Sequence, residues 1–157
     1  MIDRPFSELC IGDVKYSRGR TVTETDVVNF CMLTGNWLEI HANTEFAKAT
    51  GHGERIVQGS LIFSIVNALL PFDPSVVQVF YGVDKLRFLK PSFIGDTLWA
   101  RAETARLEQR SDGTGVATCD LQGINQRRET VMRCDFSLLI RATRLPADVQ
   151  TPFAKEE

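Results

Sequence analysis

The sequence contains no long apolar run. Its longest apolar stretch, residues 61–70, is about half of the roughly 20 residues that a membrane-spanning helix needs, and Ser64 and Asn67 interrupt it. Residues 1–5 also lack the basic start and apolar stretch of a signal peptide. We therefore expect a cytoplasmic protein that does not bind membranes.

An excess of charge of either sign is also absent. The chain has 18 Lys and Arg against 20 Asp and Glu, a net charge of −2, whereas nucleic-acid-binding proteins usually present a basic face. We expect no nucleic-acid partner.

Paired cysteine motifs are missing as well. The chain has no C-x-x-C pair, which excludes the usual zinc and redox motifs. We expect no metal site, no resident cofactor and four reduced thiols: Cys10, Cys31, Cys119 and Cys134. Cys31 and Cys134 lie in apolar patterns, which predicts that both are in the core.

What the chain does have is the composition of one globular domain. Hydrophobic residues make up 43% of its 157 residues and charged residues 24%. Helical patterns dominate the first half and strand patterns the second, with no internal repeat, which indicates an α+β fold rather than alternating strands and helices.

Three helices are predicted in the first half. Thr23 can cap a helix that has acidic residues in its first turn and ends at Gly35. A short helix follows Asn43 and stops by Gly51. Residues 59–70 are apolar around most of a helical circumference, which predicts a central helix that is buried on most sides and ends before Pro71.

The second half supplies the predicted sheet. Residues 76–88, 97–110, 116–124 and 131–141 are typical of strands, with a hairpin turn at 111–115 and one further strand at 14–22. In residues 131–141, apolar side chains alternate with polar ones. The pattern predicts an antiparallel sheet curved around the central helix, followed by a frayed tail from about residue 146.

His41 is the leading candidate for chemistry. It lies in a connection between two predicted helices, and histidine can accept and donate protons near neutral pH. The segment taken alone favours a histidine that only stabilises the fold, and this interpretation is stronger still for His52, which lies between glycines.

The start of the central helix is the second candidate. Gly59 would allow a ligand close to the unpaired N–H groups there, which can polarise a thioester carbonyl. A glycine that only makes room for packing is the alternative. Arg87 and Lys90 can bind phosphates, although a solvated surface role is the more common one for each.

Taken together, these features resemble the MaoC-like hot-dog domain family. The motifs occur in the family's order: Phe6-Ser-Glu-Leu, Gly12-Asp13, residues 21–26, residues 36–47, Arg55-Ile56 with Gly59, Arg87-Phe88 with Lys90-Pro91, Gly95-Asp96 and Arg141. The resemblance implies a single hot-dog fold, with a curved antiparallel sheet wrapped around a long central helix. We assign residues 1–145 to this domain and residues 146–157 to the C-terminal tail.

The resemblance also implies a function. The family contains R-specific enoyl-CoA hydratases and acyl dehydratases, whose motif is Gly-Asp, four residues, His. By position, His41 matches the family histidine, Gly59 matches the donor to the thioester oxygen, and Arg87 and Lys90 are candidates for binding CoA. The resemblance further implies an acyl-CoA thioester substrate and a homodimer formed by pairing of sheet edges.

The sequence departs from the family pattern at the catalytic aspartate. Asn36 occupies that position and can orient a water but cannot accept its proton. The family also often has Asn-Pro at positions 38–39 and His at position 58. Glu39 can supply a carboxylate if residues 39–41 are extended, or if residues 36–39 form one helical turn. A surface charge is the favoured interpretation of Glu39.

Three functions therefore remain open. The first is hydration of 2-enoyl-CoA thioesters, or dehydration in the reverse direction, with His41 as acid and base and Asn36 or Glu39 assisting. The second is binding of acyl-CoA without hydration, which the asparagine at position 36 explains simply. The third is thioester hydrolysis, for which the chain has no G-x-S-x-G motif.

Overall fold

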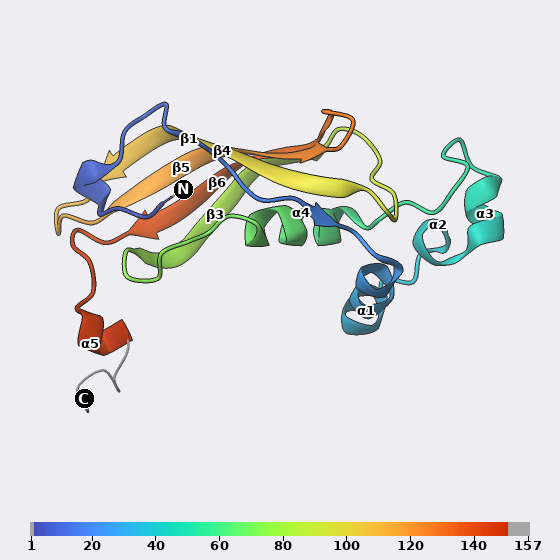
Figure 1. The fold of residues 1–157 in the computed structure, drawn as a ribbon, viewed down its shortest axis with the longest axis horizontal. Coiled ribbons are helices and arrows are strands. Elements are labelled where there is room, and N and C mark those ends of the chain that lie inside the picture. Colours follow the sequence, from blue (N-terminus) through green and yellow to red (C-terminus); the bar gives the residue numbers. More distant parts are fainter. Residues whose placement is uncertain (1, 151–157) are drawn as a thin grey trace.

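A curved antiparallel sheet carries one helix on its concave side in the computed structural model, which describes residues 2–150 (Figure 1). Within these residues the sheet has six strands, in the order β1-β4-β5-β6-β3, and β2 pairs with another part of β4. The strands are β1 (Val14–Tyr16), β2 (Arg20–Thr21), β3 (Val77–Phe88), β4 (Thr97–Gln109), β5 (Gly115–Asn125) and β6 (Thr130–Ile140).

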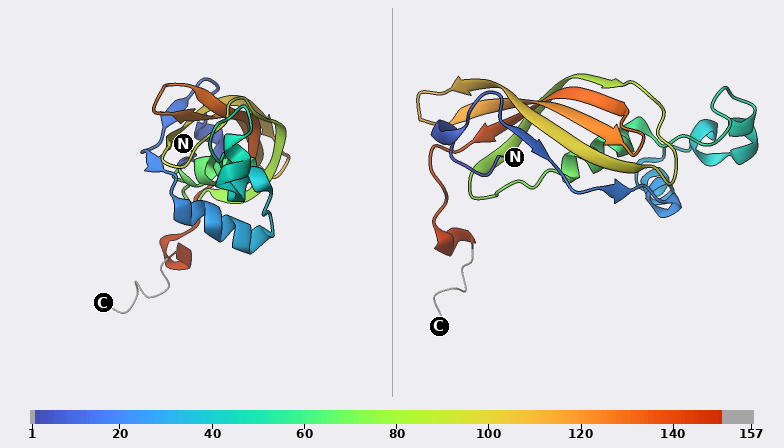
Figure 2. Two further views of the ribbon diagram at one scale, coloured as in Figure 1. Left: turned by 90° about the vertical axis from the view of Figure 1, so that its right-hand side faces the viewer. Right: turned by 45° about the horizontal axis from the view of Figure 1, so that its top comes forward.

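The helices gather mainly at one end of the sheet. The chain forms η1 (Phe6–Glu8), α1 (Glu24–Thr34), α2 (Glu39–Ala42), α3 (Thr44–Lys48), α4 (Gly59–Ala68) and α5 (Ala147–Gln150). α1, α2 and α3 lie beyond the first turn of α4, while the sheet curves over α4 itself (Figure 2). This arrangement brings the connection before α4 close to α2.

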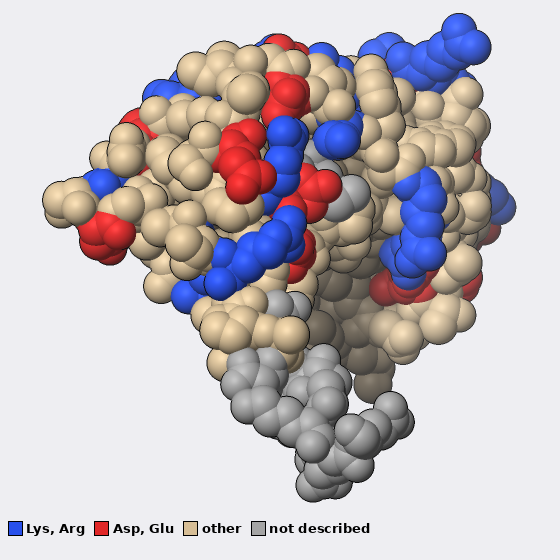
Figure 3. Space-filling model, turned by 60° about the vertical axis from the view of Figure 1, so that its left-hand side comes forward, with Lys and Arg blue, Asp and Glu red and all other residues tan. Residues whose placement is uncertain are grey.

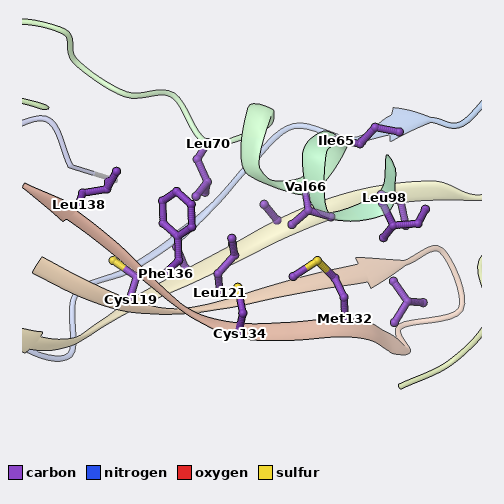
Figure 4. Packing of buried hydrophobic residues seen from close by; sticks show 14 of the residues in the cluster. Ile65, Val66, Leu70, Leu98, Cys119, Leu121, Met132, Cys134, Phe136 and Leu138 are labelled. Atoms are coloured by element: carbon purple, nitrogen blue, oxygen red, sulfur yellow. The ribbon is translucent and has the colours of Figure 1, made fainter. Parts of the chain in front are cut away.

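The central helix packs on the sheet through one broad face. Leu61, Ile62, Ile65 and Val66 are buried, which is the spacing of a helical face. Val66 faces the inner side of the sheet, where Leu121, Met132 and Phe136 lie (Figure 4), and all four buried residues of α4 belong to the hydrophobic core. The prediction of burial on most sides is confirmed for this face, but Ser60, Ser64 and Ala68 form an exposed stripe.

A glycine in β5 allows this close packing. A Cβ atom built on Gly123 would lie 2.7 Å from Val66 Cγ2 and 2.8 Å from Met132 Cγ. Both are closer than ordinary carbon contacts, so a larger residue would push α4 away from the sheet. The position of α4 on the sheet therefore depends on the close approach between Gly123 and Val66.

Most of the predicted elements are confirmed. Thr23 and Asp26 form a capping box at the start of α1, and Gly35 ends that helix in a left-handed conformation with φ 71°. In β4, burial alternates from Leu98 to Thr104. The alternation predicted for β6 is present, except that Val131 and Ser137 are buried as well. The four cysteines are free thiols, and Cys31 and Cys134 are in the core, as predicted.

Three local predictions were wrong. The strand expected at 14–22 is split because the chain passes over the Trp99 ring at Gly19, where a Cβ atom would lie 2.7 Å from that ring. Residues 39–42, expected to be a connection, form α2. The predicted frayed tail begins with α5, after Leu145 N–H donates to the Ser75 carbonyl over 2.9 Å; residues 151–157 lie outside the described part.

On the face shown in Figure 3, Lys and Arg side chains are interspersed with Asp and Glu. On the sheet, Arg133 pairs with Asp120 at 2.6 Å and Lys85 with Asp135 at 2.9 Å. Within residues 2–150, no helix is both long and apolar enough to cross a membrane.

Candidate active site

His41 is held in one orientation by a backbone carbonyl. Its side chain is buried within α2, and its Nδ1 lies 2.7 Å from the carbonyl oxygen of Ile56. A carbonyl oxygen can only accept a hydrogen bond, so Nδ1 carries the proton in the neutral ring and Nε2 is left as the acceptor. This is the arrangement that a general base requires.

Backbone hydrogen bonds also hold α2 and the segment before α4 in place relative to each other. The N–H of His41 donates to the Leu38 carbonyl over 2.8 Å, which closes the turn of α2. The N–H of Ile56 donates to the Ile40 carbonyl over 3.3 Å. The segment before α4 is thus bonded to α2 through backbone and side chain together.

A cavity of about 340 Å³ lies between His41 and the first turn of α4. Its walls are mostly apolar and come from α2, α4, the ends of β3 and β6, and the connection after β3. The lining residues are His41, His52, Ile56, Val57, Gly59, Ile62, Phe88, Leu89, Lys90, Pro91, Ser92 and Val131. The structure therefore brings together three of the residues that the sequence singled out, His41, Gly59 and Lys90.

The first turn of α4 offers N–H groups to this cavity. The N–H of Ile62 is the one that closes the first intrahelical bond, to the Gln58 carbonyl over 3.0 Å, so the N–H groups of residues 59–61 have no partner within the helix. Gly59 is the first residue of α4 and lines the cavity. Its N–H can donate to a carbonyl oxygen bound there, and the helix dipole favours negative charge on that oxygen.

Phe88 limits the space beside Gly59. A Cβ atom built on Gly59 would lie 2.6 Å from Cε2 of the Phe88 ring. The ring therefore rests directly on the glycine and forms one wall of the cavity. Position 59 therefore needs room for Phe88, in agreement with the packing alternative weighed for this glycine.

The segment that leads into α4 is anchored to α1. The Arg55 guanidinium makes two hydrogen bonds to the Glu24 carboxylate, one of them 2.9 Å long, and these bonds raise the pKa of Arg55. The buried Gln58 side chain donates to Cys31 Sγ over 3.0 Å. These contacts hold the start of α4 in place from the side opposite the sheet.

Glu39 and Asn36 do not line the cavity. Residues 39–42 are helical, so the extended geometry that would have put Glu39 beside His41 is absent. The Glu39 carboxylate instead accepts a 2.5 Å hydrogen bond from Asn43, the N-cap residue of α3. Asn36 precedes α2, and its N–H donates to Thr34 Oγ1 over 3.3 Å.

The two predicted phosphate-binding residues lie at different places. Lys90 lines the cavity and pairs with Glu129 at 2.9 Å. Arg87 lines a neighbouring hollow of about 410 Å³, together with Lys85 and Arg133. The Arg87 guanidinium donates to the Leu86 carbonyl over 2.8 Å. Unlike Lys90, Arg87 makes no ion pair with a carboxylate among the described residues.

Sequence reasoning missed several parts of the site. The Ile56 carbonyl, which orients His41, is a backbone atom and has no sequence signal of its own. Phe88 and Ser92 were seen only as strand and turn residues, yet both line the cavity. His52, interpreted as a structural residue, is exposed but also lies at the cavity.

Comparison with known families identifies the fold and its relatives. The model of the MaoC-like domain matches residues 8–123. The chain belongs to the MaoC-like family. This confirms the resemblance inferred from the motifs, and the matched region contains both His41 and Gly59.

The known relatives of this MaoC-like chain include longer proteins. It is 36% identical over 103 residues to Protein MaoC of Klebsiella aerogenes, which covers 64% of this chain and 30% of that protein. It is 30% identical over 156 residues to the mesaconyl-CoA hydratase of Cereibacter sphaeroides, covering 98% and 46%. The chain therefore spans about a third to a half of the length of these two relatives.

Solved structures confirm the hot-dog fold. A protein from Archaeoglobus described as a monoamine oxidase regulatory protein is 38% identical, with a TM-score of 0.84 and coverage of 91% of this chain and 99% of that one. A Mycobacterium tuberculosis protein with a double hot-dog fold has a TM-score of 0.74 at 22% identity, covering 88% and 44%. The MaoC-like chain described here is a single hot-dog domain of the α+β class.

The contact between Gly59 and Phe88 gives a prediction about the cavity wall. Gly59→Ala should destabilise the fold by about 1–3 kcal/mol, because the new methyl group must displace the Phe88 ring. Phe88→Ala should remove most of that penalty, so the double variant should be more stable than the sum of the single effects allows. Urea unfolding of the four proteins measures the coupling, and purely additive effects would contradict the contact.

Proposed function

We propose that this chain is a hydratase and dehydratase of acyl-CoA thioesters, which adds water to a 2-enoyl thioester or removes it from a 3-hydroxyacyl thioester. The observation that carries the proposal is the shared cavity of His41 and Gly59. His41 Nδ1 bonds to the Ile56 carbonyl, which leaves Nε2 as the proton acceptor, and His41 and Gly59 both line the cavity. The hydratase relatives support the same reaction class.

His41 alone can balance the protons of this reaction. Its Nε2 takes a proton from water as the hydroxyl group bonds to C3 of the enoyl chain. The C2=C3 electron pair moves toward the thioester carbonyl, whose oxygen gains negative charge and is stabilised by the N–H of Gly59. The imidazolium then returns its proton to C2. No carboxylate is needed for the balance, and we propose that no metal or resident cofactor takes part.

The substrate chemistry also fits the location of the charges. We propose that Arg87 binds a phosphate group of CoA, since guanidinium groups bind phosphates through paired N–H donors. Arg133 and Lys85 lie in the same hollow but are already paired with Asp120 and Asp135. Lys90 would need to release Glu129 to do the same. An acyl-CoA substrate and reduced cysteines both fit the cytoplasm, where we place the protein.

A homodimer is part of the proposal. β3 lies at the edge of the sheet, and its far side has no partner strand in the described residues. Val79, Phe80 and Tyr81 on this strand are about half exposed, whereas unpaired edge strands are usually protected by charge or by a covering element. Pairing of this edge with the same strand of a second copy would cover these residues.

Binding without catalysis is the second candidate function. It is favoured by Asn36, which stands at the position of the family's aspartate, and by the absence of Asn36 and Glu39 from the cavity lining. A positioned general base typically contributes about 10²–10⁴-fold to a rate, so a site that lacks one of two such groups can lose turnover while it keeps its ligand.

The first prediction concerns turnover. Purified protein should hydrate crotonyl-CoA, and His41→Gln should lower kcat/KM by about 10²–10⁴-fold because the variant lacks the proton acceptor. Glu39→Gln is the matched control: it should leave the rate nearly unchanged, because Glu39 only bonds to Asn43. Loss of enoyl absorbance measures hydration, and release of free CoA thiol would reveal hydrolysis instead.

The turnover assay also separates the two candidate functions. If neither the natural protein nor Asn36→Asp hydrates any chain length, while acyl-CoA still raises Tm, the chain binds thioesters without hydrating them. If Asn36→Asp gains activity, position 36 contributes to the site in the working protein. Equal activity of His41→Gln and the natural protein would overturn the proposed mechanism.

The second prediction concerns CoA recognition. Arg87→Ala should raise KM about 10-fold for crotonyl-CoA but not for the N-acetylcysteamine thioester, which has no phosphate to bind. Arg106→Ala is the control, because Arg106 pairs with Glu108 on β4, away from this hollow. An equal effect on both thioesters would show that Arg87 acts on the fold rather than on the phosphates.

The third prediction concerns assembly. At micromolar concentration the chain should sediment as a dimer, and Val79→Lys should shift it toward the monomer because a lysine on the edge strand opposes pairing. Lys48→Ala on the exposed face of α3 should leave the dimer intact. Sedimentation velocity distinguishes the two states, and a monomeric natural protein would contradict the proposal.

A further inference from the structure

Asp96 is a buried carboxylate at the start of β4 with a complete set of donors. It is 3% exposed, and it accepts hydrogen bonds from the Phe93 N–H at 3.0 Å and from Gln126 at 2.6 Å. The Arg127 guanidinium adds two more, at 2.8 and 3.0 Å, in a paired arrangement. A buried charge is retained only when it is bonded in this way.

Asp96 joins two parts of the chain that are far apart in sequence. Gln126 and Arg127 belong to the turn between β5 and β6, whereas Phe93 belongs to the connection between β3 and β4. The bond to Phe93 closes a tight turn that is also secured by the Asp96 N–H to the Phe93 carbonyl at 3.1 Å. The carboxylate therefore fixes residues 93–96 relative to the rigid end of the sheet.

The fixed connection in turn holds the segment that precedes α4. The N–H of Val57 donates to the Ser92 carbonyl over 2.8 Å. Ile56 and Phe93 form an isolated antiparallel bridge beside this bond. The backbone at 56–57 is thus attached to the sheet through residues 92–93. Residues 92–93 are in turn attached to the sheet through Asp96.

The same segment positions both functional groups of the cavity. The Ile56 carbonyl bonds to His41 Nδ1, and α4 begins three residues later at Gly59. Three hydrogen bonds in series therefore connect Asp96 to the imidazole: Phe93 N–H to Asp96, Val57 N–H to the Ser92 carbonyl, and His41 Nδ1 to the Ile56 carbonyl. Ser92, Val57 and Ile56 line the cavity, whereas Asp96 does not.

We infer that Asp96, paired with Arg127, is a positioning residue for the active site: it sets the location of the Ile56 carbonyl and thereby the tautomer and orientation of His41. It does not line the cavity and contacts neither His41 nor Gly59. The effect on rate rests on the proposed hydratase function, whereas the effect on the imidazole does not.

The neighbouring carboxylate of Glu129 provides a matched control. Arg127 also donates to Glu129 at 3.0 Å, and Lys90 bonds to the same carboxylate at 2.9 Å. Glu129 thus shares the guanidinium and the turn with Asp96, but it makes no hydrogen bond to residues 92–93. A variant at Glu129 weakens the turn without removing the bond to Phe93.

The test compares Asp96→Asn with Glu129→Gln in the full chain. Nitrogen-15 NMR of the two histidines, with His41 identified by its loss in His41→Gln, reports which ring nitrogen carries the proton. We expect His41 to hold its proton on Nδ1 in the natural protein and in Glu129→Gln. In Asp96→Asn we expect the second tautomer to appear and the hydrogen-bonded Nδ1 proton to exchange faster with solvent.

Kinetics provide the second measurement. Asp96→Asn should lower kcat about 10- to 100-fold with KM within about threefold, because displacement of a positioned group by about 1 Å costs on this order. Glu129→Gln should change kcat less than threefold. Both variants are assayed well below their Tm, so that unfolded protein does not contribute.

The outcomes separate this inference from the proposed function. If His41→Gln abolishes hydration but Asp96→Asn matches the natural protein in tautomer and kcat, the function stands and the inference is wrong. If no protein hydrates a thioester, the imidazole spectrum alone decides the inference. Equal changes in tautomer and kcat for Glu129→Gln would overturn the inference, because they would show that the turn between β5 and β6, and not the bond from Asp96 to Phe93, positions the imidazole. Should Asp96→Asn not fold, Arg127→Lys, which keeps the charge but loses the paired bonds, should show a smaller shift in the same direction.

Discussion

The hydrogen bond between the His41 ring and the Ile56 carbonyl is the interaction on which the site depends. A histidine on a four-residue helix at the end of the sheet has little support from its own element. The bond to Ile56 compensates for this, because the segment at 56–57 is tied to the sheet on one side and to α1 on the other. The site is thus built from a short helix, but its geometry is set by the rigid core.

That core explains why the cavity is located at the start of α4. The apolar face of α4 packs on the sheet along β5 and β6. Because Gly123 in β5 has no side chain, the helix approaches the strand until Val66 contacts it. β4 extends past the first turn of α4 (Figure 1), and the cavity at this turn is lined by residues of α2, β3, β6 and the connection after β3. Fixed donors in a site that excludes water stabilise developing charge more strongly than donors on an open surface.

The sequence was sufficient for the parts of the molecule that follow local rules. The cap at Thr23, the stop at Gly35 and the alternation along β6 each depend on side chains close together in the chain, and all three are confirmed. It was insufficient where the deciding contact is distant: the break at Gly19 depends on Trp99, some 80 residues away in the printed sequence. The Ile56 carbonyl is a further case, because a backbone oxygen looks the same in every sequence.

The same distinction bears on Glu39 and Asn36. Residue spacing predicts which side chains share one side of a strand or of a helix, but only if it is known whether the segment forms a strand or a helix. Here a helix begins at Glu39 itself. Glu39 then supports the cap of α3 through Asn43, so its carboxylate is already engaged. His41 is left as the titratable group of α2 at the cavity. If hydration occurs at this site, the imidazole must both remove the proton from water and return it to carbon, and its fixed tautomer makes Nε2 the atom that performs both steps.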